Sequence, residues 1–172
     1  MLQAHNKVES KNLFIESALP KFLTAVRQKT LRDVIIFKGI GLHTGNNVSM
    51  KIFPASANTG IMFRRKIGNK VILIKADYRN VRSTKLCTLL SDRDGNSIST
   101  VEHILSAIYA FEIDNVIIEL TSNEIPVYDG SAKDFVKQIK EFGFEEQESF
   151  KKFIKIKKPV EVKSGRKYAR VC

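Results

Sequence analysis

A glutamate and a histidine stand side by side at Glu102 and His103, and together they offer a proton acceptor and a metal ligand. The residues around them predict a helix that opens with a Ser99–Glu102 capping box and ends near Phe111. Neighbours on a helix point about 100° apart, so the two side chains do not ligate one metal together. They can divide the work of metal-assisted hydrolysis, with His103 on the metal and Glu102 taking a proton from water. The simpler alternative is that Glu102 completes the capping box and His103 packs against a sheet.

A catalytic zinc site takes three protein ligands, and the residues offer few recruits besides His103. His43 lies in the turn Gly39–Gly45, where glycines let a backbone approach a ligand closely. Asp129 is explained equally well by a turn before a helix. Cys87 fits a small buried apolar residue in a strand. The residues alone therefore leave a metal site as an open hypothesis.

The elements that must position these residues follow from the spacing of apolar side chains. Runs rich in β-branched residues predict strands at Leu31–Phe37, Val48–Phe53, Ile61–Arg65, Val71–Ala76, Thr84–Leu90 and Asn115–Leu120. A second helix is expected from Ser131 to Phe142, ended by Gly143, followed by a hairpin of Ile154–Val162 and Lys167–Val171. This order predicts an α+β fold, a two-layer sandwich in which a mainly antiparallel sheet packs on two helices.

The chain of 172 residues is 43% hydrophobic, which suffices for one domain and a fragment of another. We expect an N-terminal extension at 1–27, with an amphipathic pattern that Pro20 interrupts, a first domain at 28–150, and the start of an incomplete second domain at 151–172. No apolar run approaches the roughly twenty residues of a membrane span. Two cysteines and the absence of a signal-peptide pattern predict a cytoplasmic protein.

The positive charge is concentrated at the end of the chain. Residues 151–172 contain nine Lys or Arg and one acidic residue, Glu161, and so carry +8 of the net +11. A nucleic-acid-binding module, whose tail interleaves cations with Phe150, Phe153 and Tyr168, is therefore the alternative function. A basic surface also suits an enzyme that acts on anionic lipid precursors, with at most peripheral membrane association.

Several motifs in order and in register resemble the N-terminal half of the UDP-3-O-acyl-N-acetylglucosamine deacetylase family, the zinc amidases of lipid A biosynthesis. They are Gly39-Ile-Gly-Leu-His-Thr-Gly45, Pro54-Ala-Ser-Ala-Asn-Thr-Gly60 with Arg64-Arg65, Ser99-Thr-Val-Glu-His103, Ile113-Asp-Asn-Val116 and Glu124-Ile-Pro-Val-Tyr-Asp-Gly-Ser-Ala132. The resemblance runs from about Gln28 to Val171.

The resemblance implies roles for five residues. His103 matches a zinc ligand, and Glu102 matches the general base that activates water at the zinc for attack on the N-acetyl carbonyl. His43, Thr84 and Cys87 match substrate-binding positions for UDP-3-O-acyl-N-acetylglucosamine. Lys85 departs from the pattern, because some family members carry an apolar residue there.

By the same resemblance, the remaining zinc ligands belong to a second half that this sequence does not contain. We therefore expect the site for one Zn²⁺ to be incomplete and the isolated chain to lack deacetylase activity. The chain then needs the missing C-terminal half or a separately encoded equivalent. A truncation, a split gene and an inactive remnant remain open alternatives.

Overall fold

The computed structural model describes residues 26–172, which fall into two compact parts, 26–152 and 153–172. The N-terminal extension expected at 1–27, with its amphipathic pattern, lies outside the described residues except for its last two positions. Arg27, the last of these, begins strand β1 (Arg27–Leu31).

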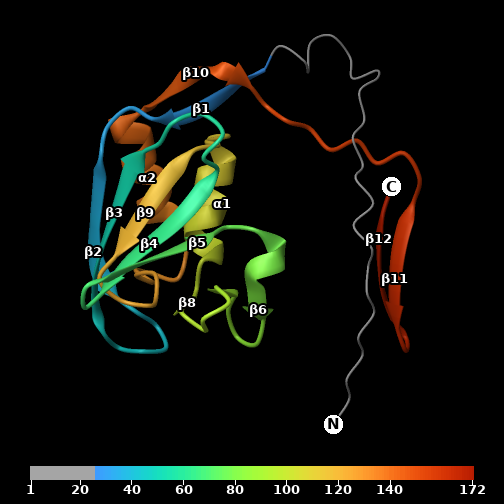
Figure 1. Ribbon diagram of the computed structural model, residues 1–172, viewed down its shortest axis with the longest axis horizontal. Helices are drawn as coiled ribbons and strands as arrows, with labels where there is room; N and C mark the ends of the chain where they lie inside the picture. Colours follow the sequence, from blue (N-terminus) through green and yellow to red (C-terminus); the bar gives the residue numbers. More distant parts are fainter. Residues whose placement is uncertain (1–25) are drawn as a thin grey trace. The chain divides into compact units, whose positions relative to one another are not determined.

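The larger part is built on a five-stranded sheet in the order β2-β3-β9-β4-β5 (Figure 1). Its strands are β2 (Ile35–Ile40), β3 (Asn47–Pro54), β9 (Val116–Leu120), β4 (Ile61–Ile67) and β5 (Lys70–Lys75). Neighbouring strands are antiparallel except β4 and β9, which run parallel. The predicted mainly antiparallel sheet is confirmed.

Helices α1 (Glu102–Ala110) and α2 (Lys133–Phe142) pack on one face of this sheet, as Figure 1 shows. Residues that alternate along the strands point to the helices and are buried, for example Met50 and Ile52 on β3. The ring of Phe37 on β2 meets Phe135 on α2 edge-on, with 5.2 Å between ring centroids. The two-layer α+β sandwich expected from the sequence is therefore confirmed.

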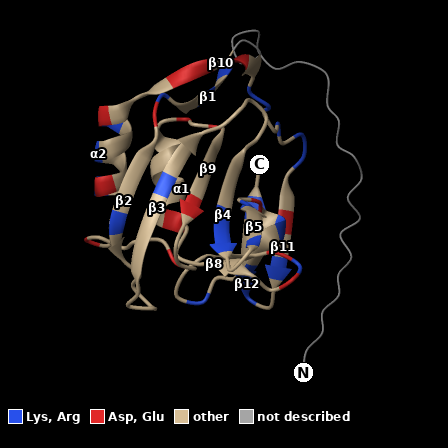
Figure 2. Ribbon diagram, turned by 60° about the vertical axis from the view of Figure 1, so that its left-hand side comes forward, with Lys and Arg blue, Asp and Glu red and all other residues tan. Residues whose placement is uncertain are grey.

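A predicted strand at Leu31–Phe37 is wrong, because the chain bends at 32–34 and divides it between β1 and β2. The Asp33 carboxylate accepts a hydrogen bond from the Val34 N–H, which favours a bend over an extended strand. β1 then pairs with β10 (Phe144–Phe150), a strand the sequence did not predict. β10 contains three glutamates, seen in red in Figure 2, and β1 carries Arg27 and Lys29.

Amide side chains, buried at Gln28 and Asn115 and half-buried at Gln147, meet where β1 and β10 approach the start of β9. Asn115 donates to Gln28 at 2.8 Å and to Gln147 at 2.7 Å, and its oxygen accepts from the Gly60 N–H at 2.8 Å. Gln28 also accepts from the Asn58 N–H. We call Gln28, Asn115 and Gln147 the amide cluster.

A small three-stranded sheet, β6 (Val81–Ser83), β7 (Leu89–Ser91) and β8 (Ser97–Ile98), follows the 3-10 helix η1 (Tyr78–Asn80). The predicted strand Thr84–Leu90 is wrong, because residues 84–88 form an irregular loop between β6 and β7. Leu86 has a left-handed backbone, with φ of 66°, which is incompatible with an extended strand.

The second helix ends as predicted and begins slightly later than predicted. Gly143 follows α2 with φ of 80°, a conformation in which glycine carries no steric penalty. No side chain caps the first turn at Ala132, whereas the Ser131 hydroxyl accepts from the Lys133 N–H at 3.1 Å.

The part at 153–172 contains the antiparallel hairpin β11 (Val160–Ser164) and β12 (Lys167–Val171). The predicted hairpin is confirmed, but its first strand begins at Val160 rather than Ile154. Pro159 lacks an N–H and cannot donate to a ladder, so it separates the irregular residues before it from the strand. Of the helices in the described part of the chain, none combines the length and hydropathy of a membrane-spanning segment.

Candidate active site

Helix α1 presents Glu102 and His103 in its first turn, where both are half-buried. Ile104, Ala107 and Ile108 pack into the core, with Glu102 on the opposite side of the helix and His103 at the edge of this buried stripe. The apolar residues thus fix which side of α1 faces the sheet, and they leave the Glu102 and His103 side chains accessible to a ligand.

The predicted capping box at the start of α1 is wrong. No side chain caps the helix at Val101, and the Ser99 hydroxyl donates to the Asn123 oxygen instead. The Glu102 carboxylate reaches away from its own helix and accepts a hydrogen bond from the Thr88 N–H at 3.0 Å. A contact with a distant loop has replaced the local one, so the carboxylate is held by tertiary structure.

The loop at 84–88 is joined to α1 by this bond. Thr88 also accepts a hydrogen bond from the Val101 N–H at 3.4 Å, so both of its main-chain polar groups meet the start of the helix. Cys87, a free thiol, is half-buried and immediately precedes Thr88. Thr84 is exposed, as is Leu86. The structure therefore places Cys87 one residue from a group that binds Glu102, with Thr84 further along the same loop.

His103 differs from Glu102 in having an unengaged side chain. Its main-chain oxygen accepts from the Ser106 hydroxyl at 2.8 Å. Among residues 26–172, no hydrogen bond or ion pair holds its imidazole. Both ring nitrogens are therefore open to a ligand or metal.

His43 lies in the exposed turn between β2 and β3, and a buried carboxylate holds that turn. Glu124 accepts hydrogen bonds from the His43 N–H at 2.9 Å, the Thr44 N–H at 2.9 Å and the Thr44 hydroxyl at 2.7 Å. The Thr100 hydroxyl donates to the same carboxylate at 3.1 Å. Burial opposes the charge of Glu124, but these hydrogen bonds outweigh it, and the pKa of its carboxyl lies below the ordinary value.

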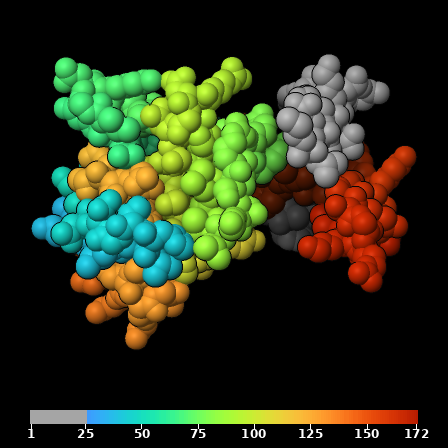
Figure 3. Space-filling model, turned by 90° about the horizontal axis from the view of Figure 1, so that it is seen from below, coloured from blue at the N-terminus to red at the C-terminus, as the bar shows by residue number. Residues whose placement is uncertain are grey.

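The candidate residues come from three segments at one end of the five-stranded sheet. Figure 3 looks at that end and shows the cyan β2–β3 turn, orange residues near 125 and yellow-green residues near 90–100 on one face. The hydrogen bonds of Glu124 and Thr88 join these segments to the start of α1. Neither Thr88 nor Glu124 stands out in the sequence by residue type, and the one available signal is that Glu124 opens a motif that carries the family resemblance.

A metal site does not assemble from the described residues alone, since 26–172 contain no group of three His, Cys, Asp or Glu side chains placed to hold an ion. Asp129, an expected recruit, accepts from the N–H and hydroxyl of Ser131, as a turn residue would.

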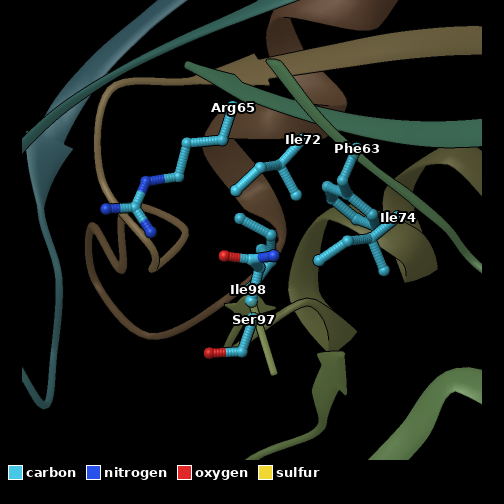
Figure 4. A pocket seen from close by; sticks show the side chains of 7 residues that line it. Phe63, Arg65, Ile72, Ile74, Ser97 and Ile98 are labelled. Carbon is cyan, nitrogen blue, oxygen red and sulfur yellow. The ribbon is translucent and has the colours of Figure 1, made fainter. Parts of the chain in front are cut away.

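Two hollows in the described surface contain none of the candidate residues. One of about 490 Å³ is lined by residues of β2 and β3 at the base of the His43 turn, including Lys38 and Asn47. Another lies where β4, β5 and β8 meet, with Arg65 and apolar side chains such as Phe63 around it (Figure 4). The second has no room for a water molecule and contains none of the candidate residues.

Comparison with known proteins gives a family match over residues 28–172, to the model described as UDP-3-O-acyl N-acetylglycosamine deacetylase, LpxC. Curated proteins named UDP-3-O-acyl-N-acetylglucosamine deacetylase are similar over the same region. Those of Aliivibrio fischeri and Idiomarina loihiensis are 45% and 47% identical over 146 residues, which is 85% of this chain and 48% of each relative. That of Vibrio vulnificus is 45% identical over 144 residues, or 84% of this chain and 47% of the relative.

The chain thus spans about half the length of the curated relatives it matches. The match includes the basic residues 151–172, the segment on which the alternative of a nucleic-acid-binding module rests. Because the family model covers most of the sequence, this chain belongs to the UDP-3-O-acyl N-acetylglycosamine deacetylase family.

Proposed function

We propose that this chain supplies half of a hydrolytic centre that removes the N-acetyl group from UDP-3-O-acyl-N-acetylglucosamine in lipid A biosynthesis. The observation that carries the proposal is the accessible pair Glu102 and His103 at the start of α1, within a domain of the deacetylase family. The reaction adds water across the acetamide carbonyl and releases acetate and a free amine.

The proposed cofactor is one Zn²⁺, and His103 fits the role of a ligand because its imidazole has no protein partner among residues 26–172. A single imidazole is too few for a catalytic zinc site. We propose that the other ligands come from the part of the relatives' length that this chain does not span. When bound, zinc polarises a carbonyl and lowers the pKa of water.

Glu102 is the proposed general base. One carboxylate oxygen, Oε2, accepts the Thr88 N–H, which fixes the direction of the group. Within residues 26–172 the other oxygen has no hydrogen-bond donor, so it can accept a proton from the attacking water. The same carboxyl group can then pass that proton to the amine nitrogen as the C–N bond breaks.

His43, Thr84 and Cys87 are the proposed substrate contacts. His43 and Thr84 are exposed, and Cys87 is half-buried beside the loop residue that binds Glu102. We propose a cytoplasmic location, which the two free cysteines, Cys87 and Cys172, support.

A chimera tests this function. The matched region of the Aliivibrio fischeri relative is replaced by residues 28–172 of this chain, and acetate release from UDP-3-O-acyl-N-acetylglucosamine is measured with zinc present. The chimera should turn over substrate, whereas the isolated 172-residue chain should release no acetate above background. An inactive but folded chimera contradicts the proposed function, and turnover by the isolated chain contradicts the need for a second half.

A further inference from the structure

We propose that Glu124 is a positioning residue that sets the His43 turn relative to the start of α1. The inference deepens the proposed function and rests on it, since His43 is the proposed substrate contact and α1 carries Glu102 and His103. Glu124 bonds to the His43 turn and to Thr100, which lies two residues before α1.

The contacts of Glu124 use both carboxylate oxygens. Oε1 accepts from the His43 N–H and the Thr100 hydroxyl, and Oε2 accepts from the N–H and hydroxyl of Thr44. The residue is 0% exposed. Among residues 26–172 no Lys or Arg pairs with it, so four hydrogen bonds balance the buried charge. A buried carboxylate with these donors fixes the backbone of the turn.

The segment before α1 also depends on this part of the chain. Thr100 is buried with φ of 60°, a left-handed conformation that β-branched residues rarely adopt and that persists only when the surroundings enforce it. The flanking Ser99 donates its N–H to the Asn123 oxygen and accepts from the Ile125 N–H. The residues around Glu124 therefore hold the main chain at Ser99, three positions before Glu102.

The approach of the turn to the carboxylate is close. A Cβ atom added at Gly41 would lie 2.4 Å from Glu124 Oε2 and 2.5 Å from the Thr44 hydroxyl oxygen. A side chain at this position therefore fits only if the Glu124 carboxylate or the Thr44 hydroxyl shifts. The absence of a side chain at Gly41 thus lets the turn pack directly against the Glu124 carboxylate.

The Glu124 carboxylate bonds to the main chain of the turn and leaves the His43 imidazole free. Glu124 binds the N–H of His43 rather than its imidazole, and the His43 side chain stays exposed. Fixing the backbone restricts where the imidazole can point without consuming its hydrogen-bonding capacity. This is the arrangement a substrate contact requires.

Amide hydrogen exchange of the 172-residue chain, followed by NMR, tests the placement. In Glu124→Gln the side-chain NH₂ cannot accept a hydrogen bond, so the His43 or Thr44 N–H loses its partner. We expect exchange at one or both of these amides to become at least about tenfold faster. Exchange at the core strand β9 reports global unfolding, so it should become faster only by the factor that the loss in unfolding free energy sets. The matched control is Glu119→Gln on β9, a carboxylate that does not contact the His43 turn. Exchange at the His43 and Thr44 amides should be the same in this variant as in the wild type.

Unchanged exchange at both His43 and Thr44 in a folded Glu124→Gln variant overturns the proposal. If that variant fails to fold, Gly41→Ala supplies the test, because its Cβ displaces Oε2 while the carboxylate remains. Faster exchange at Thr44 supports the proposal, and wild-type exchange there contradicts it.

A second readout separates positioning from simple stabilisation. The His43 ring signals are titrated with UDP-3-O-acyl-N-acetylglucosamine in the wild type, Glu124→Gln and Glu119→Gln. We expect the Glu124 variant to need about tenfold more ligand for the same response, and the Glu119 variant to match the wild type. Equal responses in the wild type and the Glu124 variant contradict the positioning role. Should the wild type itself not respond, the proposed substrate contact fails, and the exchange result still decides whether Glu124 holds the turn.

Discussion

The two ends of strand β9 are held by different chemistry. At its start the amide cluster of Gln28, Asn115 and Gln147 joins β1 and β10 to the sheet. Beyond its end, the Glu124 carboxylate joins the His43 turn to the segment before α1. Figure 1 shows β1 and β10 at one end of the sheet and the β2–β3 turn at the other.

The two ends of β9 differ in the groups that stabilise them, which are neutral amides at one end and a buried carboxylate at the other. Neutral amides carry both donors and acceptors, so the side chains of the amide cluster bond to one another and to neighbouring main-chain groups. An ionised carboxylate can only accept hydrogen bonds, and Glu124 accepts them from two main-chain N–H groups and two hydroxyls. The His43 side chain next to it remains exposed. The end that carries the proposed substrate contact is thus fixed through its backbone.

The largest effect on stability is expected at the amide cluster. Asn115→Leu leaves Gln147 and the Gly60 N–H without their partner in a site where Asn115 is 1% exposed. We expect the free energy of unfolding to fall by about 3 kcal/mol or more, measured by urea denaturation. Asn80→Ala, which removes a bond from an exposed amide to the Lys75 oxygen, is the control and should cost less than about 0.5 kcal/mol. Equal losses would show that the cluster does not close this end.

The carboxylate end should show a smaller effect that depends on pH. Glu124→Gln is expected to cost about 2 kcal/mol at pH 7, because a buried N–H loses its acceptor. The folded-state pKa of Glu124 is below the ordinary 4.5, so the wild type owes this stability to the charged form. The advantage is complete above the unfolded-state pKa and is lost as pH falls through the folded-state value. Denaturation of the wild type and variant between pH 7 and acid should therefore converge. Parallel curves would contradict a charged Glu124.

A third prediction concerns the ion pair beside the amide cluster. The Lys151 ammonium pairs with the Asp114 carboxylate at 2.9 Å and donates to the main-chain oxygen of Glu112 at 2.6 Å. The Lys151 side chain is 12% exposed. Lys151→Met should cost about 1 kcal/mol by thermal or urea unfolding. The exposed pair of Lys70 and Asp94 is the control, and Lys70→Met should change stability by less than about 0.5 kcal/mol. The reverse order would mean that burial does not decide the strength of these pairs.

Periodicity predicted the parts of the fold whose side chains alternate between core and solvent. Val48–Phe53 and Val71–Ala76 match β3 and β5 closely, since each carries β-branched or aromatic residues on the buried face. β10 was not predicted because its Phe-Glu-Glu-Gln-Glu-Ser-Phe sequence lacks a continuous apolar face. Its pairing with β1 depends on contacts across more than 110 residues, which no local pattern reveals.

The candidate site residues were chosen by residue type, and the long-range hydrogen bonds around them were not predicted. Glu102 and His103 stood out because their chemistry is distinctive in any sequence. The partner of Glu102 proved to be Thr88 rather than the local Ser99, and the contacts of Glu124 with His43 span 81 positions. Such bonds depend on how the segments meet in the fold, which a local pattern does not contain.

The most direct test of the account compares two carboxylates at the ends of α1. In the chimera, acetate release from UDP-3-O-acyl-N-acetylglucosamine is measured for Glu102→Gln and for Glu112→Gln, whose side chain is 64% exposed and pairs with Lys29. We predict that the Glu102 variant folds and binds substrate but loses at least about 100-fold in kcat, as expected for a lost general base. The Glu112 variant should keep the activity of the parent chimera. An equal effect of the two substitutions, or full activity without the Glu102 carboxylate, would contradict the claim that this helix terminus is half of the hydrolytic centre.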